Sequence, residues 1–176
     1  MHLESEKSFD ISSDLHELSK TKMYIICSGA KSILDINKTY EHLETLGISR
    51  IGYQTNYIPG FWYYQTDKKV DYNFNKIEEL TNYLKIHENI KQDSSVLIFN
   101  PAPKNKSIDK TLIDNWINIS VKKAKKNKIV GSELTPYLIK EINVLSNNQT
   151  LDTNMDLIIN NAFLAGKLAY SFSKIS

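Results

Sequence analysis

Hydrophobic and polar positions along this chain follow two different periods. Nearly continuous apolar residues at 23–27 and 95–100, and a similar short segment at 50–54, predict strands that are buried in a sheet. Other segments have apolar residues three or four positions apart, as amphipathic helices do. That spacing predicts helices over 10–20, 36–46, 75–87, 109–126, 136–145 and 153–172.

Capping residues set the boundaries of several of these helices. Asp10 and Asp35 precede two of them, where a carboxylate can accept hydrogen bonds from unpaired backbone N–H groups. Gly47 ends the second helix, because glycine tolerates the left-handed backbone conformation of a helix end. Pro136 suits a first helical turn, where its missing N–H costs little.

The alternation of strands and helices predicts an α/β fold in one domain that spans residues 1–176. We expect a layered α/β/α sandwich around a mixed, partly parallel sheet. Residues 23–54 form a strand–helix–strand unit, whose crossover is right-handed if its strands are parallel. Residues 55–72 contain Pro59, Gly60 and many aromatic residues, which predicts an irregular segment whose rings serve packing.

Composition narrows the possible functions without naming one. The net charge is only +2, and the scattered lysines are joined by a single arginine, Arg50, which argues against nucleic-acid binding. Cys27 is the only cysteine, so we expect no internal disulfide, no multi-cysteine zinc site and a reducing compartment. Because the sequence has neither an apolar run of membrane-spanning length nor a signal peptide, we expect a cytoplasmic protein without membrane contacts.

Lys31 is the first candidate for chemistry. It follows the strand at 23–27 and Gly29, where we expect the chain to turn sharply into a helix. Burial and the positive end of that helix would both lower the pKa of an ammonium group, and a neutral amine is a nucleophile. The alternative is an ordinary solvated surface lysine, which is the commoner case beside a glycine turn.

Further motifs flank Lys31 in a fixed order. They are Asp10-Ile-Ser-Ser-Asp14-Leu before it, and Ile51-Gly-Tyr-Gln-Thr55, Asn100-Pro-Ala-Pro103, Leu134-Thr-Pro-Tyr137 and Thr153-Asn154-Met-Asp-Leu-Ile-Ile-Asn-Asn161 after it. With this order and spacing, the chain resembles the pseudouridine-5'-phosphate glycosidase family of indigoidine synthase A-like proteins over nearly all of its length. The resemblance implies an enzyme that reversibly cleaves pseudouridine 5'-phosphate into uracil and ribose 5-phosphate.

The resemblance also implies roles for three residues. Lys31, in a Gly-Xaa-Lys-Ser motif, matches the lysine that forms a Schiff base with the opened ribose. Asp14 matches an aspartate that binds a divalent metal, Mn²⁺ or another such as Mg²⁺, and Asn154 matches an asparagine that helps to hold the substrate. The family further implies a homotrimer whose partners are small molecules: the substrate and its two products.

These residue types suit the implied chemistry. The bond between sugar and base in pseudouridine 5'-phosphate joins two carbons, so hydrolysis by two carboxylates is poorly suited to it. A lysine amine that adds at the anomeric carbon gives an iminium that stabilises cleavage. One aspartate completed by water is typical of magnesium or manganese, and an asparagine amide offers both a donor and an acceptor.

Family members are longer on the N-terminal side, and the resemblance places the general acid and much of the phosphate binding there. We therefore expect the sheet to be incomplete on that side. Two alternatives to the enzyme stay open. In the first, the chain is a truncated, noncatalytic remnant, or half of a split enzyme, that retains metal or sugar-phosphate binding. In the second, it is an unrelated α/β ligand-binding module.

Overall fold

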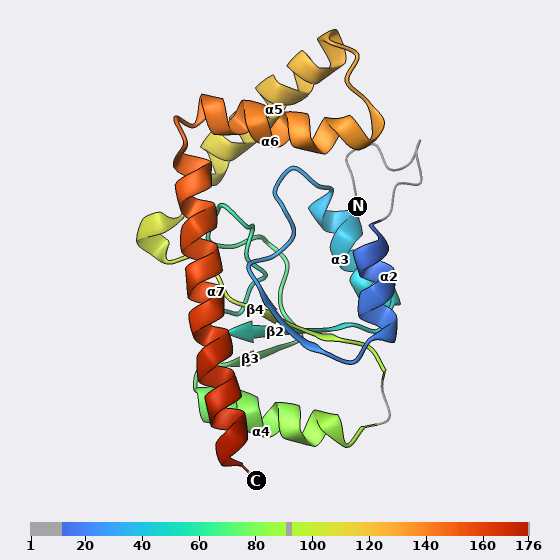
Figure 1. The fold of residues 1–176 in the computed structure, drawn as a ribbon, viewed down its shortest axis with the longest axis vertical. Helices are drawn as coiled ribbons and strands as arrows, with labels where there is room; N and C mark the ends of the chain where they lie inside the picture. Colours follow the sequence, from blue (N-terminus) through green and yellow to red (C-terminus); the bar gives the residue numbers. More distant parts are fainter. Residues whose placement is uncertain (1–11, 91–92, 176) are drawn as a thin grey trace.

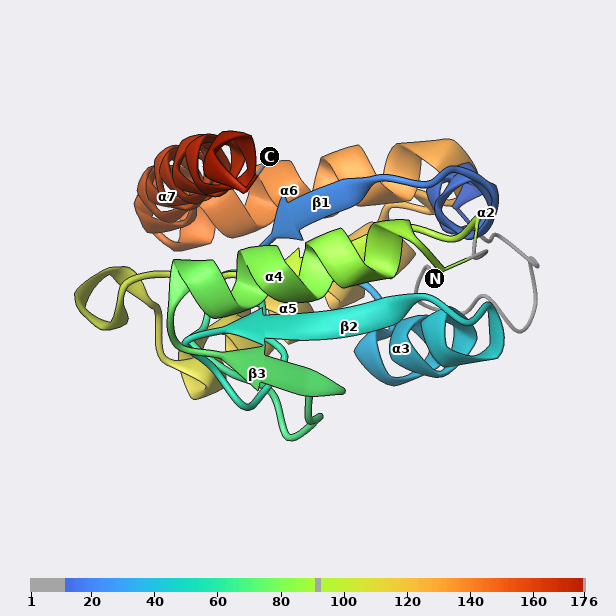
Figure 2. The same ribbon diagram turned by 90° about the horizontal axis from the view of Figure 1, so that it is seen from below.

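Four parallel strands form the centre of the structure, a computed structural model that describes residues 12–90 and 93–175 (Figures 1 and 2). They are β1 (Tyr24–Cys27), β2 (Ser49–Tyr53), β3 (Tyr72–Phe74) and β4 (Val96–Phe99). Their order across the sheet is β1-β4-β2-β3, so β1 and β3 are its two edges. In the register of the central pairs, Leu97 lies opposite Ile25 on β1, and Ile98 lies opposite Ile51 on β2.

Helices surround this sheet. They are α2 (Ser13–Lys20), α3 (Ile36–Thr45), α4 (Ile77–Glu88), α5 (Lys110–Lys126), α6 (Leu134–Leu145) and α7 (Gln149–Lys174), with 3-10 turns at Lys104–Lys106 and Gly131–Glu133. Figure 1 shows α4 below the strands, α3 above them and α7 upright along one side. No helix within the described ranges is both long enough and apolar enough to cross a membrane.

The two faces of the sheet are covered by different helices, which confirms the α/β/α layering. Leu97 and Phe99 of β4 pack with α2 and α3, whereas Val96 and Ile98 pack with α4 and α7. All four of these β4 side chains are buried. A parallel strand covered on both faces is apolar at every position, and this explains the continuous Val-Leu-Ile-Phe run.

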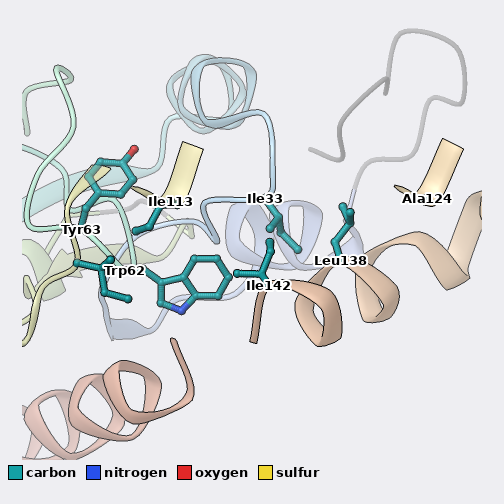
Figure 3. Close-up of a cluster of buried hydrophobic side chains, with 8 residues drawn as sticks. Ile33, Trp62, Tyr63, Ile113, Ala124, Leu138 and Ile142 are labelled. Atoms are coloured by element: carbon teal, nitrogen blue, oxygen red, sulfur yellow. The ribbon is translucent and has the colours of Figure 1, made fainter. Parts of the chain in front are cut away.

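A third apolar cluster lies away from the sheet, where α5 and α6 pack together. Figure 3 shows Trp62 and Tyr63 in this cluster with Ile142 of α6. Trp62 is 2% exposed and is the bulkiest of the fully buried side chains. The aromatic residues of the irregular segment therefore serve packing, as expected, and they join the α5–α6 pair to the rest of the chain.

The structure corrects the sequence-based expectation at several points. Because all four described strands are parallel, the mixed sheet expected from the sequence is not the one these residues form. The short strand β3 follows the irregular segment and was not predicted, and α7 begins at Gln149 rather than 153. The first described helix is capped by Ser12, whose Oγ accepts from Asp14 N at 3.3 Å, while Asp10 lies outside the described residues.

Candidate functional site

A tight turn at Gly29 fixes the backbone after β1. Gly29 has φ +91°, and a Cβ there would lie 2.1 Å from the Pro59 carbonyl oxygen, so only glycine fits. The next residues are held by hydrogen bonds: Ala30 N donates to the Tyr40 hydroxyl at 3.0 Å, and Ser32 Oγ donates to Gly60 O at 2.6 Å. Lys31 lies between these two anchored residues, so its backbone position is well defined.

The sequence suggested that Lys31 lies at a helix start, but the structure does not place it there. Its carbonyl accepts from Leu34 N at 2.9 Å in a turn, and α3 begins only at Ile36. The turn forms because Ile33 is buried in the α5–α6 cluster and Asp35 caps α3 by accepting from Lys38 N at 3.1 Å. The Lys31 side chain is exposed, so the burial and the helix start that the sequence suggested are both absent at this position.

Asn154 lines a cavity of about 280 Å³ beside the end of β1. The other lining residues come from β1, the Gly29 turn, Phe61 and α7. Its Oδ1 accepts from Trp62 Nε1 at 2.8 Å. An indole N–H can only donate, so the amide oxygen must face Trp62, and Nδ2 is the part of the amide left to donate to a ligand.

A closed ring of hydrogen bonds joins the ends of β1 and β4 to α7. Asn161 Nδ2 donates to Ser28 Oγ at 3.1 Å, Ser28 Oγ donates to Asn100 O at 2.9 Å, and Asn100 Nδ2 donates to Asn161 Oδ1 at 3.0 Å. Ser28 and Asn100 are buried, and the three side chains satisfy one another, while Ser28 and Asn161 also line the Asn154 cavity. It fixes α7 against the strand ends and so positions Asn154.

Asp14 lies at a different cavity, on the α2–α3 face of the sheet. This groove of about 450 Å³ is lined mainly by apolar side chains of α2, α3, β1 and β4. Cys27 and Gly29 line both this groove and the Asn154 cavity, whereas Lys31 lines neither. The structure thus places Asp14 and Asn154 on the two sides of the Gly29 turn, with Lys31 beyond it.

The surroundings of Asp14 fit a divalent cation that is held weakly, and they do not form a tightly binding metal site. Asp14 is exposed in the first turn of α2, and no three His, Cys, Asp or Glu side chains within the described part of the chain are grouped to hold a metal. One carboxylate completed by water suits Mg²⁺ or Mn²⁺ but not zinc. Burial raises the pKa of the nearby Cys27 thiol to about 11, so that thiol stays protonated and is a poor metal ligand.

Trp62 is the residue that the sequence gave no reason to place at this site. Ser28, Asn100 and Asn161 lie in segments that carry the family resemblance, but no segment reveals the partner of its residue. Trp62 and Asn154 are 92 positions apart. Only the fold brings these pairs together.

Comparison with known proteins gives one consistent family. A family model described as "Indigoidine synthase A like protein" matches residues 1–171. Proteins named pseudouridine-5'-phosphate glycosidase from Brachyspira hyodysenteriae and Petrotoga mobilis are 38% and 39% identical over 176 residues, which is the whole chain. Those 176 residues are 57% and 58% of these two relatives, so the chain spans a little over half of their length.

Solved structures show the same partial coverage. The prealnumycin C-glycosynthase AlnA, in complex with ribulose 5-phosphate, matches 99% of this chain with a TM-score of 0.92 and 28% identity, over 57% of its own length. An indigoidine synthase A-like protein from Thermotoga maritima matches 91% of the chain with a TM-score of 0.81 and 30% identity, over 53% of its length. The fold described above is therefore one part of a larger fold in both neighbours.

Proposed function

The chain belongs to the family of indigoidine synthase A-like proteins, and from this membership we propose that it takes part in the reversible cleavage of pseudouridine 5'-phosphate to uracil and ribose 5-phosphate. The observation that carries this proposal is the turn after β1. It holds Lys31 on a fixed backbone next to the cavity of Asn154, at the carboxyl end of a parallel strand. Ligands of α/β proteins bind at such strand ends.

Lys31 is the nucleophile in this proposal. Once its ammonium group has lost a proton, the Lys31 amine forms a bond to the anomeric carbon of the sugar while the bond from that carbon to the ring oxygen breaks, and a proton passes from the nitrogen to the ring oxygen. The nitrogen lone pair then forms a C=N bond as the carbon–carbon bond breaks. The electron pair of that bond goes to the uracil ring, which takes up a proton, and water hydrolyses the imine to release ribose 5-phosphate.

Asn154 binds the substrate through Nδ2 in this proposal. Because Trp62 occupies Oδ1, the amide can donate to a carbonyl or hydroxyl oxygen of the ligand. Ordinary hydrogen-bond energies make this a positioning contact of about 1 kcal/mol rather than a driving force for the reaction. The donor orientation favours an oxygen of the sugar or the base as its partner.

Asp14 is the residue that would hold Mn²⁺ or Mg²⁺ near the sugar phosphate. A divalent cation supplies positive charge that offsets the charge of phosphate and sugar oxygens. The remaining work falls to the chain itself, in which the Gly29 turn orients Lys31 and the hydrogen-bonded ring holds α7 and Asn154 in place.

A second candidate is favoured by the length of the match. Since the chain spans a little over half of its relatives, it would serve as a sugar-phosphate-binding part that needs further residues for turnover. In that case Lys31 still forms an imine with ribose 5-phosphate, but uracil is released only when the missing proton donor is supplied. Positioned acid–base groups contribute about 10²–10⁴-fold in rate.

Borohydride trapping tests the role of Lys31. The chain is incubated with ribose 5-phosphate and Mn²⁺, reduced and analysed by peptide mass, and we expect one labelled lysine, Lys31. Lys31→Ala should abolish the label, whereas Lys104→Ala, which removes another exposed lysine after a strand end, should not. Labelling that is spread over many lysines, or that persists in Lys31→Ala, would disprove this role. Uracil release from pseudouridine 5'-phosphate then distinguishes the full enzyme from the binding part.

A further inference from the structure

The long helix α7 is apolar on two opposite sides. Its inner side buries Leu157, Leu164 and Leu168 against the rest of the chain. Its outer side, here called the outer face of α7, exposes Leu151, Met155, Ile158, Ile159, Phe163 and Tyr170, each at 50% or more. Their spacing of three or four positions, with a gap filled by small residues, puts them on one stripe of the helix. A surface helix normally carries one apolar stripe, on the side that faces the core, so a second stripe indicates a further contact.

The edge strand β1, which contacts α7, has peptide groups on its outer side that are unpaired among the described strands. In β1 the carbonyls of Met23 and Cys27 accept from β4, so the peptide groups of Tyr24 and Ile26 point away from the sheet. The described strands offer no partner on that side. The strand has no charge, proline or glycine, which are the usual devices that keep an exposed edge from pairing.

These features meet around β1 and are together called the open side. Ile158 of the outer face lines the Asn154 cavity with Ile26 and Cys27 of β1, and Cys27 also lines the apolar groove that contains Asp14. Parallel sheets are normally covered on both faces and extended at their edges by further strands. Elsewhere in the described residues, large exposed apolar side chains such as Ile86 and Val144 stand on separate helices and form no comparable stripe.

The relatives are longer than this chain, and the additional part of their sequences is the candidate for covering this side. The same fold recurs in AlnA with a TM-score of 0.92, yet it makes up only 57% of that protein. The remainder of such a protein is available to pack against the shared part, and the open side offers it six large apolar side chains of α7 that are each at least half exposed. A second copy of this chain is a poorer candidate, because it brings none of the residues that the relatives carry in addition.

We propose that the open side, formed by the outer face of α7, the edge of β1 and the Asp14 groove, is the docking surface for the polypeptide that the relatives carry beyond the region matched here. That polypeptide adds a strand to β1 and covers α7 with apolar side chains. It also closes the Asn154 cavity, since Ile158 belongs both to the outer face and to the cavity lining. This inference rests on the family relation and not on the proposed reaction.

Co-expression tests the docking surface without any activity assay. The 176-residue chain is produced together with the unmatched part of the Brachyspira hyodysenteriae relative, and the molar mass of the product is measured by light scattering after affinity purification. We expect a complex with equal numbers of the two polypeptides. Hydrogen exchange at Tyr24 and Ile26 should slow in this complex, because a new strand would bond to their peptide groups.

A matched pair of variants localises the contact. Ile159→Lys places a charge on the outer face of α7 and should weaken the complex at least tenfold, whereas Ile86→Lys should leave it unchanged. The two isoleucines are comparable, at 65% and 67% exposed, and both lie on helices. Absence of a complex, equal effects of the two variants, or a homodimer of the chain that Ile159→Lys abolishes would each overturn the proposal, the last by identifying a second copy as the occupant.

Discussion

The two edges of the sheet are built in opposite ways. The β3 edge is short and well secured: Asp71, just before the strand, binds Arg50 by two side-chain hydrogen bonds of 2.7 and 3.2 Å, and the ring of Tyr83 packs on Tyr72 and Phe74. The β1 edge has four apolar residues and no charged one, and its ring contacts are those of Tyr24 with His87 and Phe172. The candidate chemistry lies at the β1 edge, where the Gly29 turn, Lys31 and Asn154 follow the strand.

This difference indicates which edge is the natural boundary of the fold. Charge pairs are common at edges that stay exposed, whereas apolar edges without charged residues are normally covered. The β3 edge can therefore be the true end of the sheet. In the docking proposal the β1 edge and the site beside it are completed by other residues, so mutations on the two sides should behave differently.

The largest effect is expected from a core residue on the β3 side. Ile51 is fully buried in β2, opposite Tyr72, and Ile51→Ala should lower the free energy of unfolding by about 2–5 kcal/mol. On the β1 side, Ile159→Ala removes an exposed side chain and should change the stability of the isolated chain by less than about 0.5 kcal/mol. Urea unfolding of both variants checks this, and similar losses would mean that the outer face of α7 is already packed.

The ion pair at the β3 edge should give the next largest effect. Asp71→Ala leaves the Arg50 guanidinium, whose side chain is only 14% exposed, without its main partner, and it also removes the acceptor for Arg50 N. We expect a loss of about 1–3 kcal/mol in unfolding free energy. The exposed pair of Lys110 and Asp114 is the control, because Asp114→Ala should cost less than about 1 kcal/mol. Equal losses would show that the β3 edge is not specially secured.

Sequence patterns predicted most of the fold because the buried elements carry strong local signals. β4 is apolar at every position, and Asp35 and Gly47 lie at the two ends of α3, where the structure places a cap and a positive φ. β3 was missed because its three residues have no such signal. Its strand conformation comes from pairing with β2 and from contact with Tyr83, and both of these are tertiary interactions.

The candidate site was predictable only in part, for a similar reason. The turn at Gly29 follows from a local pattern, and so does the placement of Lys31 shortly after a strand. The expected helix start at Lys31 was wrong because burial of Ile33 in a distant cluster extends the turn to Asp35. The orientation of Asn154 depends on Trp62, and no local pattern predicts a contact over that separation.

Loss of the hydrogen bond between Trp62 and Asn154 should have a moderate effect on stability and on ligand binding, confined to the β1 side. Trp62→Phe keeps most of the apolar ring but removes the donor, so Asn154 loses its fixed orientation. A double-mutant cycle with Asn154→Leu should give a coupling of about 0.5–1.5 kcal/mol in unfolding free energy. Calorimetric binding of ribose 5-phosphate should weaken in Trp62→Phe if Asn154 Nδ2 contacts the ligand. A coupling near zero would mean that the indole does not orient the amide.

The smallest effect concerns His87, which lies between the two edges. It is 3% exposed on α4, and its ring contacts Tyr24 of β1 and Tyr83, the residue that secures β3. Burial, and secondly the charge of Lys22, lower the pKa of His87 below its usual value of 6.5. Neither ring nitrogen has a hydrogen-bond partner among the described residues, which favours the neutral form.

The direction of the pH effect follows from proton binding in the two states. Below about pH 6.5 the unfolded chain binds a proton at this histidine, whereas the folded chain does not. The contribution of His87 to the free energy of unfolding is therefore fully present above that pH and is lost as the pH falls toward the folded-state pKa. One group can contribute at most about 1.4 kcal/mol per pH unit. His87→Phe keeps a ring between the two tyrosines but cannot titrate, so its stability should fall less between pH 7.5 and 5.5 than that of the wild type, as measured by urea unfolding. His16→Gln, at an exposed histidine, should follow the wild type. If His87→Phe also followed it, His87 would be protonated alike in both states, and the aromatic contact between the two edges would have to be open to water.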